Sequence, residues 1–169
     1  MSMSGPGTAQ KTILVVCAGN ICRSPIAGAF INLSLEQARL RERVTVVSAG
    51  LNVKPGQAPP GFVVNEIKLA YGLNLAGHRS QPVTPDLFQR ADLVLVMEQA
   101  QLVRLAQQYP RQTRKLRMLS ELSGRVFDIR DALLDENIEI GEMAGQINNL
   151  VTNNFATLLG WLNLKPEEI

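Results

Sequence analysis

Two kinds of hydrophobic pattern alternate along the chain. In the first, β-branched and apolar residues follow one another with little polar interruption, which is typical of parallel strands covered on both faces. Such runs predict strands at 12–17, 44–49, 93–97 and, more weakly, 115–119. In the second pattern, apolar residues recur at helical spacing. This spacing predicts a helix that is capped by Ser24 and begins at Pro25, and a long final helix from Met143 to Leu162. Further helices are predicted at 62–71, 82–90 and 98–108.

The order of these elements indicates the fold class. Strands that alternate with helices imply an α/β fold with a parallel sheet and right-handed crossovers. The chain has 169 residues, the size of one compact domain, and shows no linker or internal repeat. We therefore predict a single α/β domain over residues 12–165. Residues 1–11 are mostly small and polar, which predicts a flexible N-terminal tail.

Composition and charge exclude several classes of function. The chain is 46% hydrophobic and 19% charged, with a formal net charge of +2. A nucleic-acid-binding face needs a stronger basic excess with interleaved aromatic residues, which make up only 5% here, so we expect no nucleic-acid partner. No apolar run is long enough for membrane insertion, and the first residues lack the apolar centre of a signal peptide. These features predict a cytoplasmic protein.

The residues best suited to chemistry follow the first predicted strand. Ligands of open α/β sheets bind at the carboxyl ends of the strands. At that end the chain reads Cys17-Ala18-Gly19-Asn20-Ile21-Cys22-Arg23-Ser24, next to the predicted helix start. A short turn before a helix aims several backbone N–H groups at one point, and the helix dipole adds positive potential there. This segment therefore predicts a phosphate-binding loop, with Arg23 as a bidentate clamp.

A cysteine in this positive field is a candidate nucleophile. The helix dipole and Arg23 favour the thiolate form of Cys17, and a thiolate that faces a phosphate-sized site is aimed at phosphorus. Taken alone, Cys17 fits a buried cysteine at a strand end better. The glycine, the arginine and the Ser-Pro helix start favour the functional interpretation. The hydroxyl of Ser24 would stabilise the nearby thiolate and help it leave.

The segment Cys17 to Pro25, C-A-G-N-I-C-R-S-P, closely resembles the signature of the low-molecular-weight protein tyrosine phosphatases. The resemblance runs from about Ile13 to the last helix and includes Ser48-Ala49-Gly50, Gly77-His78-Arg79-Ser80 and Asp92 to Met97. It implies a four-stranded parallel twisted sheet flanked by helices, with the phosphate-binding loop after the first strand. It also implies hydrolysis of phosphotyrosine through a phosphocysteine intermediate, without a metal or other cofactor.

The resemblance also assigns residues. Cys17 would be the nucleophile, and Arg23 would clamp the phosphate and stabilise the transition state. The residues that would hydrogen-bond around the loop are Asn20, Ser24, Ser48 and His78. We interpret His78 as a scaffold residue rather than a proton donor. Cys22 is either a small apolar side chain under the loop or the partner of Cys17 in a protective, reversible disulfide, and the resemblance favours the disulfide.

The general acid is less clearly matched. Family members carry it in an Asp-Pro-Tyr segment before the last helix, whereas this chain has Asp131 followed by Ala132 and Leu133. Asp131 aligns best, because bacterial members often have isoleucine, one residue and then the acid, and Ile129 fits that pattern. Asp128 remains the alternative.

Substrate choice depends on an aliphatic rim. The loops that grip the aromatic ring in this family offer Leu51, Val53, Leu133 and Leu134 here, which can bury a phenyl ring without the extra ~0.5–1.5 kcal/mol of aromatic pairing. By analogy with bacterial members encoded with exopolysaccharide systems, a tyrosine kinase is a candidate partner among phosphotyrosine proteins.

Two other functions compete. One is a non-catalytic phosphotyrosine-binding module, which would need no nucleophile. The other is arsenate reductase, which needs further cysteines, and none follows Cys22.

Overall fold

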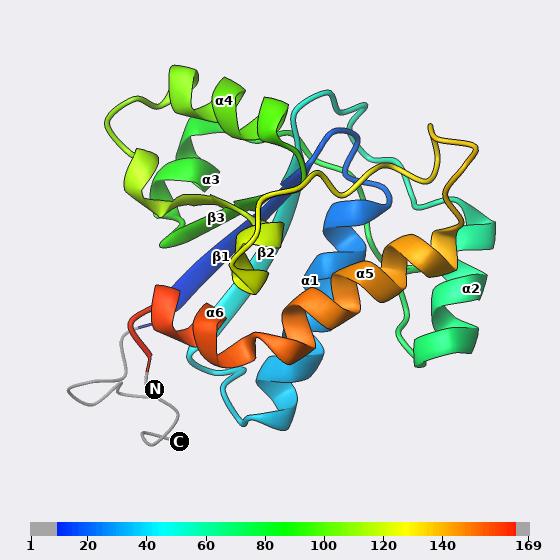
Figure 1. Cartoon of the computed structure of the whole chain (residues 1–169). Coiled ribbons are helices and arrows are strands. Elements are labelled where there is room, and N and C mark those ends of the chain that lie inside the picture. The colour runs from blue at the N-terminus through cyan, green and yellow to red at the C-terminus, as the bar shows by residue number, and fades with distance from the viewer. Residues whose placement is uncertain (1–9, 165–169) are drawn as a thin grey trace.

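The computed structural model describes residues 10–164. Within that range, strands and helices alternate through most of the chain (Figure 1). The first half contains β1 (Lys11–Cys17), α1 (Arg23–Gln37), β2 (Val44–Gly50), α2 (Gly61–Tyr71) and α3 (Pro85–Arg90). The second half contains β3 (Leu93–Val96), α4 (Gln99–Gln108), η1 (Thr113–Lys115), β4 (Leu116–Met118), η2 (Leu119–Ser123), α5 (Ile140–Asn153) and α6 (Phe155–Trp161).

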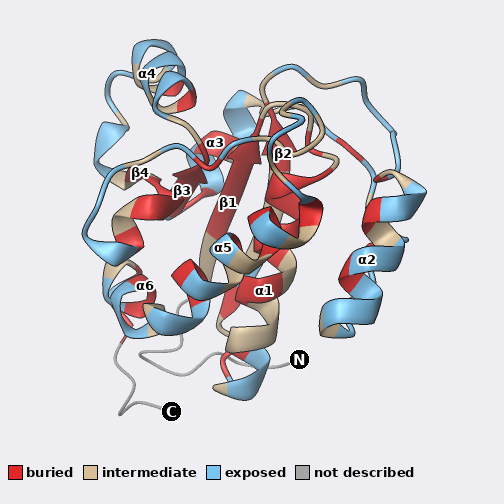
Figure 2. Cartoon of the chain, turned by 45° about the vertical axis from the view of Figure 1, so that its right-hand side comes forward, coloured by how far each residue is buried: buried red, intermediate tan, exposed pale blue. Residues whose placement is uncertain are grey.

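The four strands form one parallel sheet in the order β2-β1-β3-β4. Successive side chains of the central strand β1 enter different cores: Ile13 and Val15 face one, and Leu14 and Val16 face the other. Helices α1, α2, α5 and α6 cover the first face, and α3 and α4 cover the second (Figure 1). Figure 2 shows the central strands buried, as the unbroken apolar runs require. The prediction of a single α/β domain with a four-stranded parallel sheet is confirmed.

The predicted long final helix is wrong, because the chain breaks at Asn154 into α5 and α6. In a continuous helix the backbone N–H of Asn154 would donate to the carbonyl of Leu150. Here the side-chain amide of Asn154 donates to that oxygen at 2.9 Å, and the backbone at Asn154 leaves helical geometry (φ −128°). An asparagine side chain that competes for a backbone acceptor explains the break.

Two predicted helix starts also differ. Helix α1 begins at Arg23, so Ser24 lies inside the first turn and is not the N-cap. Pro25 remains tolerated because N–H groups of the first turn have no helical partner. Helix α3 begins at Pro85 rather than Pro82: the Thr84 side chain accepts a hydrogen bond from the Leu87 N–H, and Pro82 pairs with Gly50 at the sheet edge.

At the N-terminus, Lys11 already belongs to β1, and the predicted tail before Gln10 lies outside the described residues. The edge strand β4 is shorter than predicted, because Lys115 belongs to η1 and Leu119 to η2. Among residues 10–164, no helix is both long and apolar enough to cross a membrane. Cys17 and Gly50 end their adjacent strands side by side, which brings the loop after β1 and the loop after β2 together.

Candidate active site

The loop between β1 and α1 folds around the sulfur of Cys17, which is almost fully buried. The backbone N–H of Asn20 donates to Cys17 Sγ at 3.2 Å, and Ser24 Oγ lies 3.0 Å from the same sulfur. Ser24 Oγ also accepts a hydrogen bond from Asn20 Nδ2 at 2.8 Å. Because that bond occupies the acceptor side of the hydroxyl, the Ser24 proton is free to point at the sulfur. Two donors therefore converge on Cys17.

Asn20 holds the loop in shape from its centre. Its φ of +56° lies in the left-handed region, which asparagine tolerates better than most residues. Its side-chain nitrogen also donates to Ser48 Oγ at 3.0 Å, and its side-chain oxygen accepts from the Gln81 N–H at 2.9 Å. His78 Nε2 lies 2.6 Å from the Asn20 carbonyl oxygen, which can only accept, so Nε2 carries the proton in this contact. Ser24, Ser48 and His78 thus meet in one network.

Gly50 allows this loop to approach the sheet. A Cβ atom at Gly50 would lie 2.5 Å from the Ala18 carbonyl oxygen and 2.4 Å from Val53 Cγ2. Neither distance is compatible with a side chain, and the contact with Ala18 involves rigid backbone. The glycine that ends β2 is therefore a steric requirement of the loop between β1 and α1.

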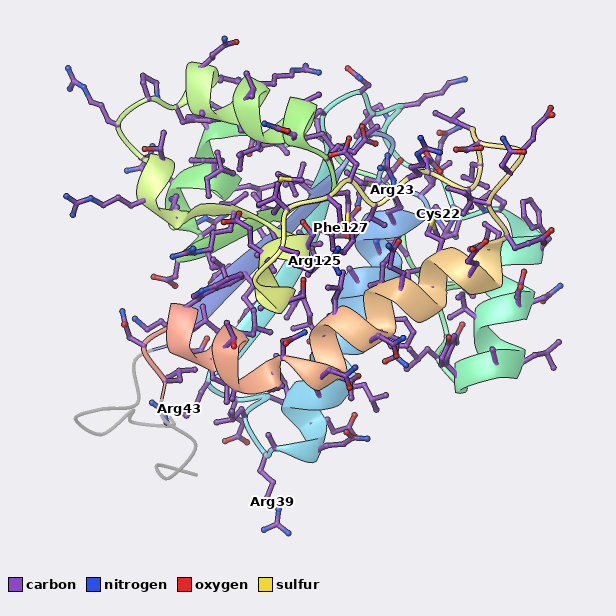
Figure 3. All side chains as sticks on the ribbon, in the orientation of Figure 1. Cys22, Arg23, Arg39, Arg43, Arg125 and Phe127 are labelled. Atoms are coloured by element: carbon purple, nitrogen blue, oxygen red, sulfur yellow. The ribbon has the colours of Figure 1, made fainter. Side chains whose placement is uncertain are left out.

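Arg23 is buried at the start of α1, where the segment that precedes α5 crosses it (Figure 3). Its Nη1 donates to the Ile129 carbonyl oxygen at 2.8 Å and forms an ion pair with Glu98. Its Nη2 lies 3.6 Å from Asp131 Oδ2, which is beyond hydrogen-bonding distance. One side of the guanidinium is therefore anchored, and the other remains available to a ligand.

Glu98 is a functional candidate that the sequence analysis missed. A signal was present, because Glu98 comes just after the strand predicted at 93–97, at the edge of the sheet where ligands bind. Gln81 was missed as well. It contributes through its backbone N–H, a group that every residue except proline has, so the residue type could not have predicted this hydrogen bond.

The two candidate acids have different surroundings. Asp131 lines a pocket of about 380 Å³ together with residues 17–23, Asn52, Leu133 and Leu134. Its Oδ1 accepts a hydrogen bond from the Leu133 N–H at 2.9 Å, which fixes the carboxyl group. Asp128 Oδ1 instead accepts from the Gln99 N–H at 2.8 Å, at the first residue of α4. The tertiary structure thus brings Asp131 beside Arg23 and uses Asp128 at a helix N-terminus.

The aliphatic rim is only partly assembled. Leu133 and Leu134 line the pocket, and Leu134 is 81% exposed. Leu51 lines an adjoining pocket, while Val53 lies against Gly50. The rim is therefore built mainly from the segment that carries Asp131.

Cys22 is buried beneath the loop, and both cysteines are free thiols. Burial raises the pKa of the Cys22 thiol to about 12, and the charges of Asp131 and Cys17 act in the same direction. Cys22 is therefore protonated at neutral pH. Among the described residues, no group of three or more histidine, cysteine, aspartate and glutamate side chains is arranged to hold a metal ion.

Comparisons with known proteins identify the family to which the chain belongs. Residues 12–159 match the model of the low molecular weight phosphotyrosine protein phosphatases. The chain is 42% identical over 122 residues to the probable low molecular weight protein-tyrosine-phosphatase EpsP of Ralstonia nicotianae, covering 72% of this chain and 77% of EpsP. It is 37% identical over 121 residues to a protein-arginine-phosphatase of Bacillus subtilis, covering 70% and 77%.

The fold is similar as well. The structure of Vibrio vulnificus Wzb in complex with benzylphosphonate superposes with a TM-score of 0.75 at 27% identity, covering 88% of this chain and 99% of that one. These matches favour a phosphatase over the alternatives of a binding module and an arsenate reductase. The chain belongs to the low molecular weight phosphotyrosine protein phosphatase family and is a phosphatase.

Proposed function

We propose that the protein hydrolyses phosphotyrosine in protein substrates through a phosphocysteine intermediate on Cys17. The observation that carries this proposal is the pocket itself, whose walls combine Cys17, the loop N–H groups, Arg23 and Asp131. Cys17 Sγ attacks phosphorus, and the bond from phosphorus to the tyrosyl oxygen breaks. The leaving oxygen takes a proton from Asp131, so that tyrosine departs as the neutral phenol.

The second step returns the enzyme to its starting state. A water molecule attacks the phosphocysteine, Asp131 takes up the proton of that water, and inorganic phosphate leaves. The electron pair of the phosphorus–sulfur bond returns to Cys17. Ser24 then stabilises the departing thiolate, because its hydroxyl lies 3.0 Å from the sulfur.

Arg23 supplies the permanent positive charge for both steps. Its Nη1 is anchored by Ile129 and Glu98, so its Nη2 enters the pocket in a fixed direction. Transition-state charge on the phosphoryl oxygens is stabilised most by donors that need no reorganisation. A buried, anchored guanidinium meets that condition.

The walls of the pocket favour phosphotyrosine over phosphoarginine. Ile21, Leu133 and Leu134 offer apolar surface to a flat ring. The name of EpsP describes a tyrosine phosphatase, and the related Wzb was crystallised with benzylphosphonate, a phosphonate with an aromatic ring. Phosphoarginine is a second candidate because of the Bacillus relative and because the Asp131 carboxyl group in the pocket wall suits a guanidinium.

A direct comparison separates the two substrates. Two peptides of the same sequence, one with phosphotyrosine and one with phosphoarginine, are hydrolysed by wild-type protein, and phosphate release gives kcat/KM for each. We expect the phosphotyrosine peptide to have the higher value. A higher value for phosphoarginine would overturn the substrate assignment. The control variant Cys17→Ser should lose both activities, because a serine hydroxyl is not ionised at neutral pH.

A further inference from the structure

A second pocket of about 270 Å³ adjoins the catalytic pocket on the side of α4. The two pockets have Ala18, Arg23, Asn52 and Leu134 in common, so they open into one crevice. A phosphorylated side chain in the catalytic pocket would therefore place a neighbouring substrate residue within reach of the second pocket. We refer to this second pocket as the side pocket.

The side pocket contains a fixed positive charge from Arg104 of α4. Its Nη1 donates to Asn52 Oδ1 at 3.0 Å, and its Nη2 donates to the Leu51 carbonyl oxygen at 3.2 Å. Within residues 10–164, Arg104 forms no ion pair with a carboxylate. Because both contacts are with neutral oxygens, its charge is not compensated, and three of its five N–H donors remain for a ligand.

A third pocket, which shares Glu98 and Leu134 with the side pocket, is acidic. It is lined by the acidic side chains of Glu98, Asp131, Asp135 and Glu136. Its arginine, Arg130, lies 3.3 Å from Asp135 and is therefore compensated. An anionic substrate residue is therefore repelled by the acidic pocket and attracted by Arg104 in the side pocket.

The charge balance of the side pocket also selects the kind of anion. Glu98 lies in its wall, and its charge is offset by the ion pair with Arg23. One uncompensated guanidinium beside this paired carboxylate suits a single negative charge. A carboxylate meets this condition, whereas a second phosphate group would bring a charge of about −1.5 to −2 close to Glu98.

We propose that Arg104 forms a specificity subsite for an aspartate or glutamate side chain of the substrate, next to the phosphorylated residue. The inference rests on the proposed phosphotyrosine activity and extends it, because it identifies which phosphopeptides are preferred. The subsite acts on substrate binding, so its effect belongs to KM rather than to kcat.

A double-mutant cycle between enzyme and substrate tests this subsite. One series of phosphotyrosine peptides carries glutamate at a single flanking position, before or after the phosphotyrosine, and a matched series carries glutamine there. Wild-type protein should prefer glutamate at one or more of these positions by about 2- to 5-fold in kcat/KM, the range of an exposed charge pair, through a lower KM. The preference should shrink at high salt.

The variant Arg104→Gln should lose this preference and keep the wild-type rate with p-nitrophenyl phosphate, which fills only the catalytic pocket. The control Arg90→Gln removes an equal charge from α3, where Arg90 pairs with Asp86, and should keep the preference. An equal glutamate-to-glutamine ratio in wild-type protein and Arg104→Gln at every position would overturn the subsite.

A failure of the subsite can be distinguished from a failure of the proposed phosphotyrosine activity. If the neutral phosphotyrosine peptide is hydrolysed without any glutamate preference, the subsite alone is wrong. If only phosphoarginine peptides are hydrolysed, the phosphotyrosine assignment is wrong. The same double-mutant cycle on phosphoarginine peptides then shows whether Arg104 favours a neighbouring glutamate.

Discussion

At the scale of single residues, Asp131 and Asp128 lie three residues apart but have different surroundings, and we propose that only Asp131 acts as the general acid. Asp131 lies in the pocket with Cys17 and 3.6 Å from an Arg23 nitrogen, whereas Asp128 accepts a hydrogen bond at the start of α4. We expect Asp131→Asn to lower phosphotyrosine turnover by ~10²–10⁴-fold, the usual contribution of a general acid. Substrates with very acidic leaving groups should lose less, because they leave without a proton.

The matched variant Asp128→Asn should stay near the wild-type rate, since the asparagine oxygen can still accept from Gln99. Steady-state kinetics on phosphotyrosine and p-nitrophenyl phosphate measure both variants. A large loss in Asp128→Asn with a near-normal Asp131→Asn would reverse the assignment of the acid.

The Cys22 thiol gives a pH-dependent prediction. Peroxide converts Cys17 to a sulfenic acid, which the thiolate of Cys22 can attack to form a disulfide with release of hydroxide. Because the Cys22 pKa is raised to about 12, its thiolate fraction is small at neutral pH and grows about tenfold per pH unit below that value. We therefore expect the disulfide to close about tenfold faster at pH 8 than at pH 7.

Mass spectrometry of peroxide-treated protein at a series of times measures this closure. Reductant should restore activity in wild-type protein, and recovery should be largely lost in Cys22→Ser. Unchanged recovery in Cys22→Ser would show that Cys22 does not protect Cys17.

At the scale of elements, the contact between the end of β2 and the phosphate-binding loop is the tightest constraint on the site. Gly50→Ala places a methyl group 2.5 Å from the Ala18 carbonyl oxygen, so loop and strand must separate. We expect a loss of about 1–3 kcal/mol in the free energy of unfolding, the usual cost of overpacking, together with a large loss of activity. Denaturant unfolding and turnover measure the two effects.

Gly28→Ala in α1 is the matched control. A Cβ atom there would lie 3.6 Å from Val46, an ordinary van der Waals contact, and alanine is the better helix former by about 0.5–1 kcal/mol. This variant should be at least as stable as wild type and fully active. If Gly50→Ala behaved in the same way, the steric argument for the loop would fail.

At the scale of the whole molecule, the pocket exists only when distant segments are packed together. Arg23 binds Ile129, which lies 106 residues away in sequence, and Glu98, which lies 75 residues away. A phosphate ion should therefore bind the folded state alone. At 100 times its Kd it should stabilise the fold by about 2.7 kcal/mol, which for a domain of this size raises Tm by roughly 5–10 °C.

Thermal unfolding with and without inorganic phosphate measures this shift. Arg23→Gln should lose most of the shift, because the clamp is gone, whereas Arg90→Gln should keep it. A full shift in Arg23→Gln would mean that the phosphate binds elsewhere.

Much of the fold could be predicted because its signals are local. A strand covered on both faces must be apolar along its whole length, so the runs that became the central strands β1 and β3 are visible in the sequence within a residue or two. The edge strand β2, in which Thr45 is exposed, keeps enough of the same pattern to be visible as well. Helices α2 and α4 are also visible, although the exposed Phe62, Leu69 and Val103 show that apolar residues mark the buried side of these helices only in part. The loop at 17–23 could also be recognised, because its residues are consecutive in the sequence and form a single motif.

Features that depend on contacts between distant segments were decided only by the tertiary structure. The break at Asn154 arises because a side chain displaces a backbone N–H from its acceptor, a competition that residue type leaves open. Ser24 could equally cap a helix or face Cys17, and the start of α1 at Arg23 decides between them. By itself the sequence determined the layered sheet and the loop that carries the proposed nucleophile, because periodicity and a contiguous motif need no partner. The position of Asp131 beside Arg23, the anchoring of Arg23 by Glu98 and the exposed charge of Arg104 in the side pocket required the folded chain, because each depends on a distance between residues far apart in sequence.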